Sequence, residues 1–364
     1  MDDKTQYRHG GSPELDLARL SLADKPVIDF SVNLNALGIP EIIKHKWEET
    51  LNAIEGYPSV EGDGVARYYQ GKFGISSLDF LAGNGSTEMI YLIPRVLRMK
   101  QALIITPSYN DYERASLLAG TEVTRIPLSP DADFSFPDMD ILISALRNSN
   151  GLWLGRPNNP TGSLFPKGRL LELAGMFPEQ MFIIDEAFIQ FIDGWPENSL
   201  VNEKTRSNII VIHSLTKFYA LAGLRIGGVI GHKKLISRLR SAKEPWTVNG
   251  IADMVAPLLL ECGDYEKQTR HHVALERLRV SKMLEKVDGI HPFPSSANFI
   301  LCRWTGTKDM DDLVHHLLEN SVYVRDCRNF PGLENNFFRV GLRSVDDNDR
   351  LISALSSFPY GKQV

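Results

Sequence analysis

A series of short apolar runs, rich in β-branched residues, constrains the fold of this chain more than any other feature. Runs of this kind are typical of strands that are buried on both faces of a sheet. Two stretches beside them have the apolar spacing of helices: 86–99 precedes the first run, and 141–148 lies between the first and the second. The alternation predicts an α/β domain in which helices cover a mostly parallel sheet. The runs lie at residues 102–106, 152–155, 181–185, 208–213 and 226–231.

The pattern changes after about Gly250. A longer helical stretch at 265–287 is followed by short apolar segments near 298–304 and 337–343, which predicts a smaller α+β domain. A chain of 364 residues is long enough to bury its cores without disulfides or a structural metal. The predicted parts are an N-terminal segment that packs against the small domain and the active site (1–40), a large α/β domain (41–250) and a small C-terminal α+β domain (251–364).

The charge balance and the cysteines exclude several classes of protein. Forty basic and 45 acidic side chains give a formal net charge of −5 at pH 7, which speaks against a nucleic-acid binder or a membrane-surface protein. The three cysteines, Cys262, Cys302 and Cys327, are widely separated and have no CxxC spacing, so we expect no disulfide framework, no metal site and a cytoplasmic location. The first residues are acidic and no uncharged apolar run approaches about 18 residues, so we expect neither export nor a membrane span.

The segment 83–87, with the sequence GNGST, comes directly before a helical stretch. Glycines let the backbone bend closely there, and the free amides of a first helical turn bind anions, which favours a phosphate site. The segment lacks the Gly-Lys-Ser/Thr of a Walker A loop and the full GxGxxG dinucleotide fingerprint. A plain turn from a loop into a helix is the alternative.

Two charged residues follow predicted strands. Asp185 ends the run 181–185, and a carboxylate buried there needs a cation or a donor, although a helix cap is an equally simple role. Lys217 comes shortly after another run, with Arg225 eight positions later. A lysine in an apolar interior loses its charge readily, as a Schiff-base amine requires, whereas a lone lysine is usually solvated at the surface. Residues 214–217 also match the SxxK of serine β-lactamases, but no SDN or KTG accompanies them.

In open α/β sheets, ligands bind beyond the carboxyl ends of the strands. The predicted phosphate site at 83–87, the carboxylate of Asp185, and Lys217 with Arg225 are therefore expected to lie together. These are the groups that pyridoxal phosphate needs: an anchor for its phosphate, a partner for its ring nitrogen and an amine for its aldehyde. The combination predicts a pyridoxal phosphate enzyme more specifically than any single motif does.

Three segments resemble the signature of the fold-type I pyridoxal phosphate enzymes of the class I and II aminotransferase group. They are 158–162 (NNPTG), 185–188 (DEAF) and 214–227 (SLTKFYALAGLRIG). The resemblance covers essentially the whole chain. It implies an α/β fold in which a large, cofactor-binding domain has a mostly parallel seven-stranded sheet, together with a smaller α+β domain and a homodimeric assembly.

The resemblance also implies roles for single residues. Lys217 would bond to the cofactor aldehyde, Asp185 would pair with the protonated ring nitrogen, and Asn158 would hydrogen-bond the ring hydroxyl. Tyr109 would stack on the ring, and Tyr57 would reach the neighbouring cofactor across a dimer interface. The residues implied to hold the cofactor through and near its phosphate are Gly85, Ser86, Thr87, Ser214, Thr216 and Arg225.

Within this group the chain is more similar to threonine-phosphate decarboxylases, which act in cobalamin biosynthesis, than to histidinol-phosphate aminotransferases. The latter usually carry a tyrosine where this chain has Phe188. Ala36 and Gly228 depart from patterns that are common in the group, and both departures bear on the substrate rather than on the cofactor. The segments that carry the similarity are 9–11 (HGG), 29–33 (DFSVN), 245–249 (PWTVN) and 325–333 (RDCRNFPGL).

The implied reaction is decarboxylation of L-threonine O-3-phosphate to (R)-1-aminopropan-2-ol O-phosphate and carbon dioxide. A carboxylate and a phosphate require several fixed donors, and the planar fork of arginine matches both groups. By resemblance, Arg325 and Arg339 are the two substrate arginines. The other implied substrate contacts are His9, the Gly10 amide, Asn33 and Asn158.

Several alternatives stay open at this point. An aminotransferase similar to histidinol-phosphate aminotransferases would use the same cofactor residues, because the bond that breaks depends on an orientation that no sequence reveals. A non-catalytic effector-binding domain would share the fold, although an intact Lys217 speaks against it. O-phosphoserine is a further expected substrate, since one methyl group is worth only about 1–3 kcal/mol of discrimination. An exposed strand residue is the alternative role for Arg339, and a mobile terminal residue for His9.

Overall fold

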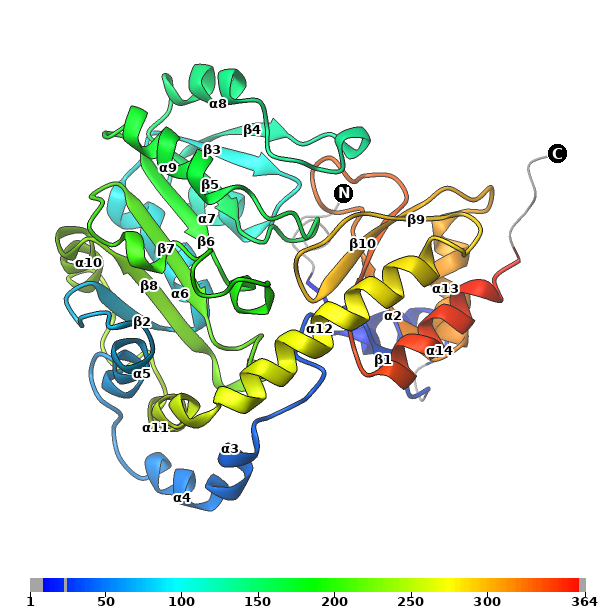
Figure 1. Ribbon diagram of the computed structural model, residues 1–364, viewed down its shortest axis with the longest axis horizontal. Coiled ribbons are helices and arrows are strands. Elements are labelled where there is room, and N and C mark those ends of the chain that lie inside the picture. The colour runs from blue at the N-terminus through cyan, green and yellow to red at the C-terminus, as the bar shows by residue number, and fades with distance from the viewer. Residues whose placement is uncertain (1–8, 23–24, 360–364) are drawn as a thin grey trace.

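The computed structural model describes residues 9–22 and 25–359 (Figure 1). Residues 1–8 and 23–24 of the predicted N-terminal segment, and residues 360–364 of the predicted small domain, lie outside the described residues. Two sheets organise the described chain, and the long helix α12 (Gly263–Leu284) runs from beside the larger sheet to the smaller part (Figure 1). α12 corresponds to the helical stretch expected at 265–287.

A seven-stranded sheet forms the centre of the larger part of the described chain. Its strands are parallel except for β8, which is antiparallel to both of its neighbours. The predicted α/β fold with a mostly parallel seven-stranded sheet is thus confirmed. In spatial order the strands are β2 (Phe80–Asn84), β8 (Ile226–Gly231), β7 (Ile209–Ser214), β6 (Met181–Asp185), β5 (Gly151–Gly155), β3 (Gln101–Thr106) and β4 (Glu122–Pro127).

Two of these strands, β2 and β4, have no counterpart among the apolar runs of the sequence. β4 lies at one edge of the sheet and most of its residues are exposed, so its sequence, EVTRIP, contains no continuous apolar run. β2 lies at the opposite edge, and its sequence, FLAGN, is interrupted by glycine and asparagine. The apolar runs therefore predict the central strands but not the two edge strands.

Helices cover both faces of the sheet. The covering helices are α5 (Asp63–Phe73), α6 (Gly85–Leu97), α7 (Asp111–Leu118), α8 (Met139–Leu146), α9 (Lys167–Met176) and α10 (Lys233–Arg240). In β6, Ile183 belongs to an apolar cluster with α6, α7 and α10, whereas Phe182 and Ile184 belong to a cluster with α5, α8 and α9. Because both faces are buried, the central strands are apolar along most of their length, and polar residues such as Asp185 of β6 and Ser214 of β7 stand at their ends.

A four-stranded antiparallel sheet organises the smaller part. Val280 and Leu284 of α12 share a core with Phe299 and Leu301 of its strand β10 (Phe299–Trp304). The predicted domain boundaries at 40 and 250 stay predictions. The other elements of this part are β9 (Ile290–Pro292), β12 (Arg325–Asp326), β13 (Phe337–Gly341), α13 (Met310–Glu319) and α14 (Val345–Ser356).

The described N-terminal residues pack against the smaller part. β1 (Ile28–Asp29) pairs in parallel with β11 (Val322–Tyr323), and Leu17 of α2 (Pro13–Arg19) packs with Leu318. The remaining elements are α3 (Glu41–His45), α4 (Trp47–Leu51), α11 (Gly250–Val255) and the 3-10 helices Asn52–Ile54, Pro130–Ala132, Ile189–Phe191, Val201–Glu203, Ala222–Leu224 and Ala256–Glu261.

Three further observations concern the described part of the chain as a whole. None of its helices combines the length and the apolar character that a membrane crossing requires. Within residues 9–22 and 25–359, no group of three or more His, Cys, Asp and Glu side chains could hold a metal ion. Cys262, Cys302 and Cys327 are buried free thiols.

Candidate active site

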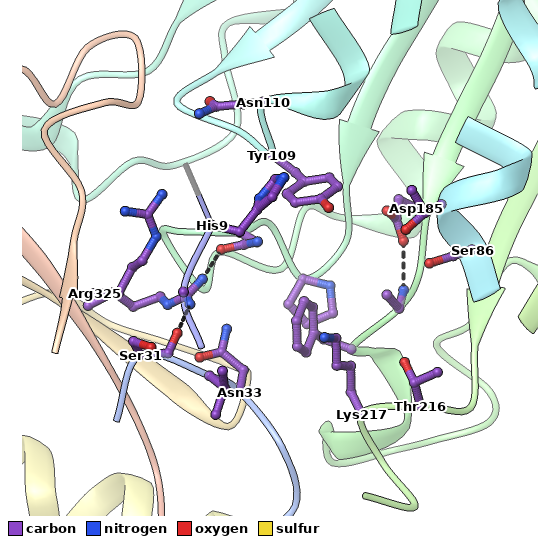
Figure 2. A pocket seen from close by; sticks show the side chains of 18 of the residues that line it. His9, Ser31, Asn33, Ser86, Tyr109, Asn110, Asp185, Thr216, Lys217 and Arg325 are labelled. Carbon is purple, nitrogen blue, oxygen red and sulfur yellow. Dashed lines mark hydrogen bonds between the residues drawn. The ribbon is translucent and has the colours of Figure 1, made fainter. Parts of the chain in front are cut away.

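A cavity of about 210 Å³ lies between the carboxyl ends of the central strands and the second sheet (Figure 2). Asp185 ends β6, Lys217 follows β7, and Arg339 faces them from β13. This is the place where open α/β sheets bind their ligands. The residues implicated by the sequence that line the cavity are His9, Gly10, Asn33, Ser86, Thr87, Tyr109, Asp185, Thr216, Lys217, Arg225, Arg325 and Arg339.

Lys217 presents an amine that is easily deprotonated. Burial is the main cause that lowers the pKa of Lys217 to about 8, and the charges of Arg225 and Arg339 act in the same direction. The carboxylate of Asp185 opposes them. No other described side chain makes a hydrogen bond or an ion pair with the Lys217 amine. About a tenth of this amine is therefore neutral and nucleophilic at pH 7, and about half at pH 8.

Asp185 is held from two sides. Tyr112 Oη donates to Asp185 Oδ2 (2.8 Å), and the backbone N–H of Ala187 donates to Oδ1 (2.9 Å). Burial raises the pKa of Asp185 to about 6, and these two hydrogen bonds and Lys217 act against that rise. No signal in the sequence points to Tyr112, which lies in the first turn of α7.

The segment that the sequence predicts as a phosphate cradle forms the start of α6. Gly85 has a φ of +70°, and a Cβ at this position would lie 2.6 Å from Arg225 Nη2. The backbone N–H of Gly85 donates to the carbonyl oxygen of Arg225 (2.8 Å), and Arg225 Nη2 donates to Thr87 Oγ1 (3.2 Å). Only a residue without a side chain lets the arginine approach the helix N-terminus this closely.

Gly85 and Ser214 lie behind this cradle rather than on the cavity wall. Ser214 Oγ lies 2.7 Å from Thr216 Oγ1, and Thr216 does line the cavity. Both residues thus contact groups that face the cavity, and neither faces it itself.

Arg339 is buried on the opposite wall. Its Nη2 donates to the carbonyl oxygen of Ser31 (2.8 Å), its Nη1 contacts Asn159 Oδ1, and its guanidinium lies 5.2 Å from the centre of the Phe299 ring. All three partners are uncharged. Burial lowers the pKa of Arg339 to about 10, so the side chain is charged at neutral pH. It is not an exposed strand residue.

Arg325 is held by the loop that follows it. Its Nη2 donates to Asn329 Oδ1 (2.8 Å), and its guanidinium lies 5.1 Å from the centre of the Phe330 ring. Arg325 is buried, and Phe330 also lines the cavity. The guanidinium is therefore fixed in place before a ligand arrives.

Residues 9–11 cover one side of the cavity. The ring of His9 lies 5.5 Å from that of Tyr109, and its Nε2 lies 3.4 Å from Asp111 Oδ2. Burial lowers the pKa of His9, and Asp111 opposes this effect. A Cβ on Gly10 would lie 2.5 Å from the carbonyl oxygen of Ser31, so only glycine allows this close approach.

The two asparagines of the NNPTG segment have different surroundings. Asn158 is buried behind the cavity wall, where its Nδ2 donates to the carbonyl oxygen of Pro107 and to Thr161 Oγ1 (both 2.9 Å). Asn159 lines the cavity and contacts Arg339. The cavity is therefore lined by Asn159 and not by Asn158, the residue that the sequence predicted.

Tyr57 lies away from this cavity. Its side chain is 89% exposed, and its ring lies 5.5 Å from that of Trp246. A role for Tyr57 at a cofactor therefore requires a second copy of the chain.

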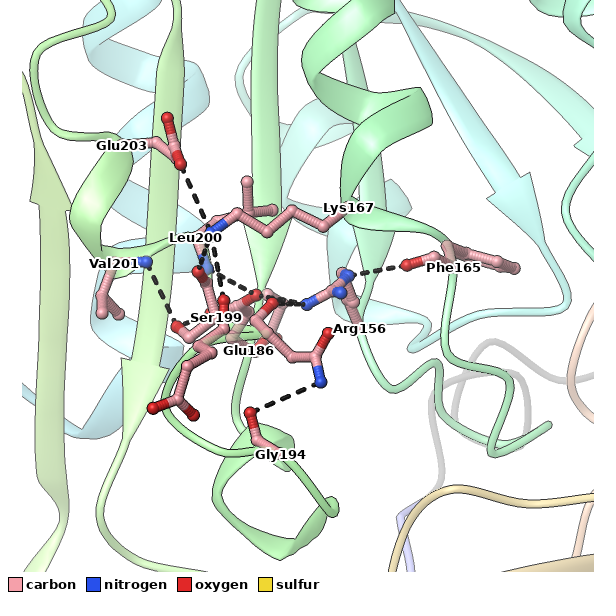
Figure 3. A network of polar contacts seen from close by, with 12 residues as sticks. Arg156, Phe165, Lys167, Glu186, Gly194, Ser199, Leu200, Val201 and Glu203 are labelled. Carbon is pink, nitrogen blue, oxygen red and sulfur yellow. Dashed lines mark hydrogen bonds and ion pairs between the residues drawn. The ribbon is translucent and has the colours of Figure 1, made fainter.

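A buried ion pair supports the strand ends beside Asp185 (Figure 3). Arg156 Nη1 lies 3.0 Å from Glu186 Oε1, and both side chains are almost completely buried. Arg156 Nε donates to the carbonyl oxygen of Phe165 (2.7 Å), and Glu186 accepts from Ser199 Oγ. Burial raises the pKa of Glu186, while Arg156 acts to lower it. The pair joins the residues directly after β5 and β6, and so steadies the strand end that carries Asp185.

Comparisons with known proteins agree with this geometry. Residues 25–355 match the family model described as aminotransferase class I and II. The chain is 33% identical over 362 residues to threonine-phosphate decarboxylase of Salmonella typhimurium, and the alignment covers 97% of each. It is 32% identical over 358 residues to the adenosylcobalamin biosynthesis bifunctional protein CobDQ of Leptospira interrogans, which covers 97% of this chain and 41% of that protein. The crystal structure of the histidinol-phosphate aminotransferase from Clostridium acetobutylicum matches with a TM-score of 0.83 at 30% identity, over 90% of this chain and 97% of that one.

Proposed function

The chain belongs to the family of class I and II aminotransferases, and we propose that it is a pyridoxal phosphate enzyme that decarboxylates L-threonine O-3-phosphate. The products would be (R)-1-aminopropan-2-ol O-phosphate and carbon dioxide, made for cobalamin biosynthesis. Two findings support the proposal: a relative of 33% identity is named threonine-phosphate decarboxylase, and the cavity is lined by cations.

The residues around the cavity fit the cofactor. Lys217 offers an amine with a pKa of about 8, and Asp185 offers a carboxylate that Tyr112 already orients. The first turn of α6 and Arg225 offer donors for a phosphate. When bound, pyridoxal phosphate supplies an electron-accepting ring for the electron pair of the bond that breaks at the substrate α-carbon.

Each of these residues has a separate task. The carboxylate of Asp185 would keep a proton on the ring nitrogen, because an adjacent negative charge favours the protonated form. The amine of Lys217 would hold the cofactor and later move a proton at its Nζ. Tyr109 would cover one face of the ring. Asn159, which faces the cavity, joins Asn158 as a candidate for the ring hydroxyl, because the buried Asn158 Oδ1 has no hydrogen-bond partner among the described residues.

The observation that carries the proposal is positive charge without a counterion. Lys217, Arg225 and Arg339 line the cavity, and no carboxylate of the described residues forms an ion pair with any of them. Cations that are buried or partly buried without an ion-pair partner are costly, so this arrangement is suited to anionic ligands. Arg225 would bind the cofactor phosphate, and Arg325 and Arg339, which both line the cavity, would bind a substrate that carries a carboxylate and a phosphate.

The same arginines would decide which bond breaks. When the cofactor is bound, Arg339 and Arg325 would fix the orientation of the substrate carboxylate, and that orientation would decide between loss of carbon dioxide and loss of the α-proton, which transamination requires. The match to a histidinol-phosphate aminotransferase structure makes an aminotransferase the second candidate.

One experiment separates the two reactions. The purified protein is loaded with pyridoxal phosphate and incubated with O-phosphothreonine without any 2-oxo acid. We expect release of carbon dioxide and formation of the amino alcohol phosphate. A reaction that depends strictly on 2-oxoglutarate would show that the protein is an aminotransferase. O-phosphoserine in a parallel reaction measures how much the extra methyl group contributes.

The assembly belongs to the same proposal: the protein would act as a homodimer. An apolar groove is lined by Ile39, Ile43, Trp47 and Leu224, and Tyr57 is exposed on the surface. A second copy of the chain would cover such a surface. Sedimentation equilibrium of the loaded protein tests this, and a monomer at working concentration would remove the proposed role of Tyr57.

The buried free thiols are compatible with a reducing compartment. We therefore propose that the protein acts in the cytoplasm.

A further inference from the structure

Asn35 lies beneath the loop that carries Lys217. Its backbone N–H donates to the carbonyl oxygen of Lys217 (3.1 Å), and its Nδ2 lies 2.7 Å from the carbonyl oxygen of Phe218. The same Nδ2 lies 2.8 Å from Tyr265 Oη and 2.7 Å from Thr269 Oγ1, both on α12. Asn35 is 5% exposed, so these contacts are shielded from water, where hydrogen bonds fix geometry firmly.

The segment that carries Asn35 also reaches the substrate side of the cavity. Residues 31, 33 and 35 are buried and alternate with less buried ones, as in an extended chain. Ser31 and Asn33 line the cavity, and Arg339 donates to the carbonyl oxygen of Ser31. Residues 31–35 therefore connect the wall that holds Arg339 with the backbone of Lys217.

Hydrogen bonds with residues of α12 hold the loop that carries Lys217. Tyr219 Oη donates to Glu266 Oε1 (2.7 Å), which also accepts from Lys72 Nζ of α5 (2.6 Å). Tyr265 Oη lies 3.2 Å from the carbonyl oxygen of Phe218. The loop 217–219 is thus held by α12 on one side and by Asn35 on the other. It lies beyond the end of β7, where no sheet hydrogen bonds fix the backbone.

We propose that Asn35 is a positioning residue for Lys217. It fixes the backbone from which Lys217 reaches the cavity, and it ties that position to the segment lining the substrate side. The inference rests on the proposed role of Lys217 as the reactive amine. A displacement of about 1 Å at a reacting group can cost on the order of 100-fold in rate, so a contact at this distance from the chemistry is sufficient to matter.

The test compares Asn35→Ala with Asn208→Ala in the full-length chain. Asn208 is a matched control, because it is also buried and its Nδ2 donates to two backbone carbonyls, those of Ala174 (2.9 Å) and Phe177 (3.0 Å), near the end of α9. Thr269→Val is a milder variant that removes one partner of Asn35 with little change in shape.

The first measurement is the rate at which the cofactor-free chain turns yellow after pyridoxal phosphate is added. This rate reports attack by the Lys217 amine without any substrate turnover. We expect Asn35→Ala to slow it about 10-fold or more. Asn208→Ala is expected to match the wild type, and Thr269→Val to lie between the two.

The second measurement is the pH dependence of carbamylation of Lys217 by cyanate, followed by peptide mass in the cofactor-free chain. The charged groups that act on this amine are Arg225, Arg339 and Asp185, and no variant changes them. The wild-type midpoint should lie near the pKa of about 8. Asn35→Ala should raise the midpoint by about half a pH unit or more, because a loosened loop lets water reach the amine.

Unchanged colour formation and an unchanged cyanate midpoint in folded Asn35→Ala would overturn the inference. If that variant does not fold, wild-type behaviour of Thr269→Val overturns it instead. A wild-type chain that takes up no pyridoxal phosphate contradicts the proposed function, whereas the cyanate midpoints still decide the role of Asn35.

Discussion

The two sides of the cavity differ in how the chain builds them. On the cofactor side, Asp185 ends β6, Lys217 follows β7 and Ser86 lies in the first turn of α6, which follows β2, so all three are placed by strands of one continuous sheet. On the substrate side, Arg325 and Arg339 come from the second sheet. The hydrogen bonds of one sheet preorganise the first side, whereas the second depends on packing between separate parts of the chain.

The N-terminal residues increase this contrast. His9 reaches the cavity from the opposite end of the chain to Arg339. The backbone N–H of nearby Gly11 donates to Ser31 Oγ (2.8 Å), and Arg339 Nη2 donates to the carbonyl oxygen of Ser31, so both walls contact the same residue. Changes on the sheet side should therefore affect cofactor retention first, and changes on the other side should affect substrate use. The following predictions test this division.

The largest effect is expected for Lys217→Ala. Without the amine, the protein should lose the yellow colour of the lysine-bound cofactor, and decarboxylation should fall to background. The matched control is Lys167→Ala, because Lys167 donates to the carbonyl oxygen of Ser199 and does not line the cavity. Visible absorbance and carbon dioxide release measure both. A yellow Lys217→Ala protein would show that another amine holds the cofactor.

The next effect separates the two sides directly. Arg225→Ala should weaken cofactor retention, while Arg339→Ala should lower kcat/KM for O-phosphothreonine and leave cofactor retention near the wild-type level. A lost charge-assisted contact of about 1.5–3 kcal/mol corresponds to roughly 10- to 150-fold. Equilibrium dialysis of the cofactor and steady-state kinetics give the two numbers. Equal loss of both properties in Arg339→Ala would contradict the division.

A pH-dependent effect is expected in the cofactor-free chain. The pKa of Asp185 is about 6 in the folded chain and about 3.9 in an unfolded chain. The folded chain therefore binds more protons between these pH values, and its stability falls as the pH rises from about 4 to 6. Asp185→Asn should remove this fall and stabilise the chain by up to about 2–3 kcal/mol at pH 7.

Urea unfolding at pH 4 and pH 7 measures this effect. The variant and the wild type should differ little at pH 4, where Asp185 is protonated in the folded chain. A larger gain at pH 4 than at pH 7 would mean that burial of the carboxylate is not the cause.

The smallest effect distinguishes the two neighbouring asparagines. Asn159→Ala should weaken cofactor and substrate binding several-fold, since it faces the cavity and contacts Arg339. Asn158→Ala should instead lower the free energy of unfolding by about 1 kcal/mol or more, because Pro107 and Thr161 lose a buried donor. Cofactor titration and thermal unfolding of both variants check this, and interchanged results would restore Asn158 as the cavity residue.

Much of the sheet side was predictable from the sequence. The central strands are largely apolar because both faces are covered, and such runs stand out in a sequence. Parallel strands that share a sheet bring their carboxyl ends to one edge, so Asp185 and Lys217 could be placed together from their positions after two runs. The edge strand β4 was missed because most of its residues are exposed, and the buried edge strand β2 was missed because glycine and asparagine interrupt its sequence.

Other parts of the site were not predictable in this way. Tyr112 contacts Asp185 only because α7 begins beside the end of β6. Asn158 and Asn159 are adjacent and identical, and they lie at a turn, so no strand or helix period tells their side chains apart. A motif of two equal letters therefore does not reveal which of them faces the ligand.

By itself, the sequence determined the order of strands and helices along the chain and the residue types that meet at the carboxyl ends of the strands. These depend on local periodicity and on the chemistry of single side chains. Only the tertiary structure decided that Arg325, Arg339 and His9 face Lys217 across one cavity, and that Asn35 supports the loop beneath it. Contacts between segments hundreds of residues apart depend on how two sheets pack, and no local pattern encodes that packing.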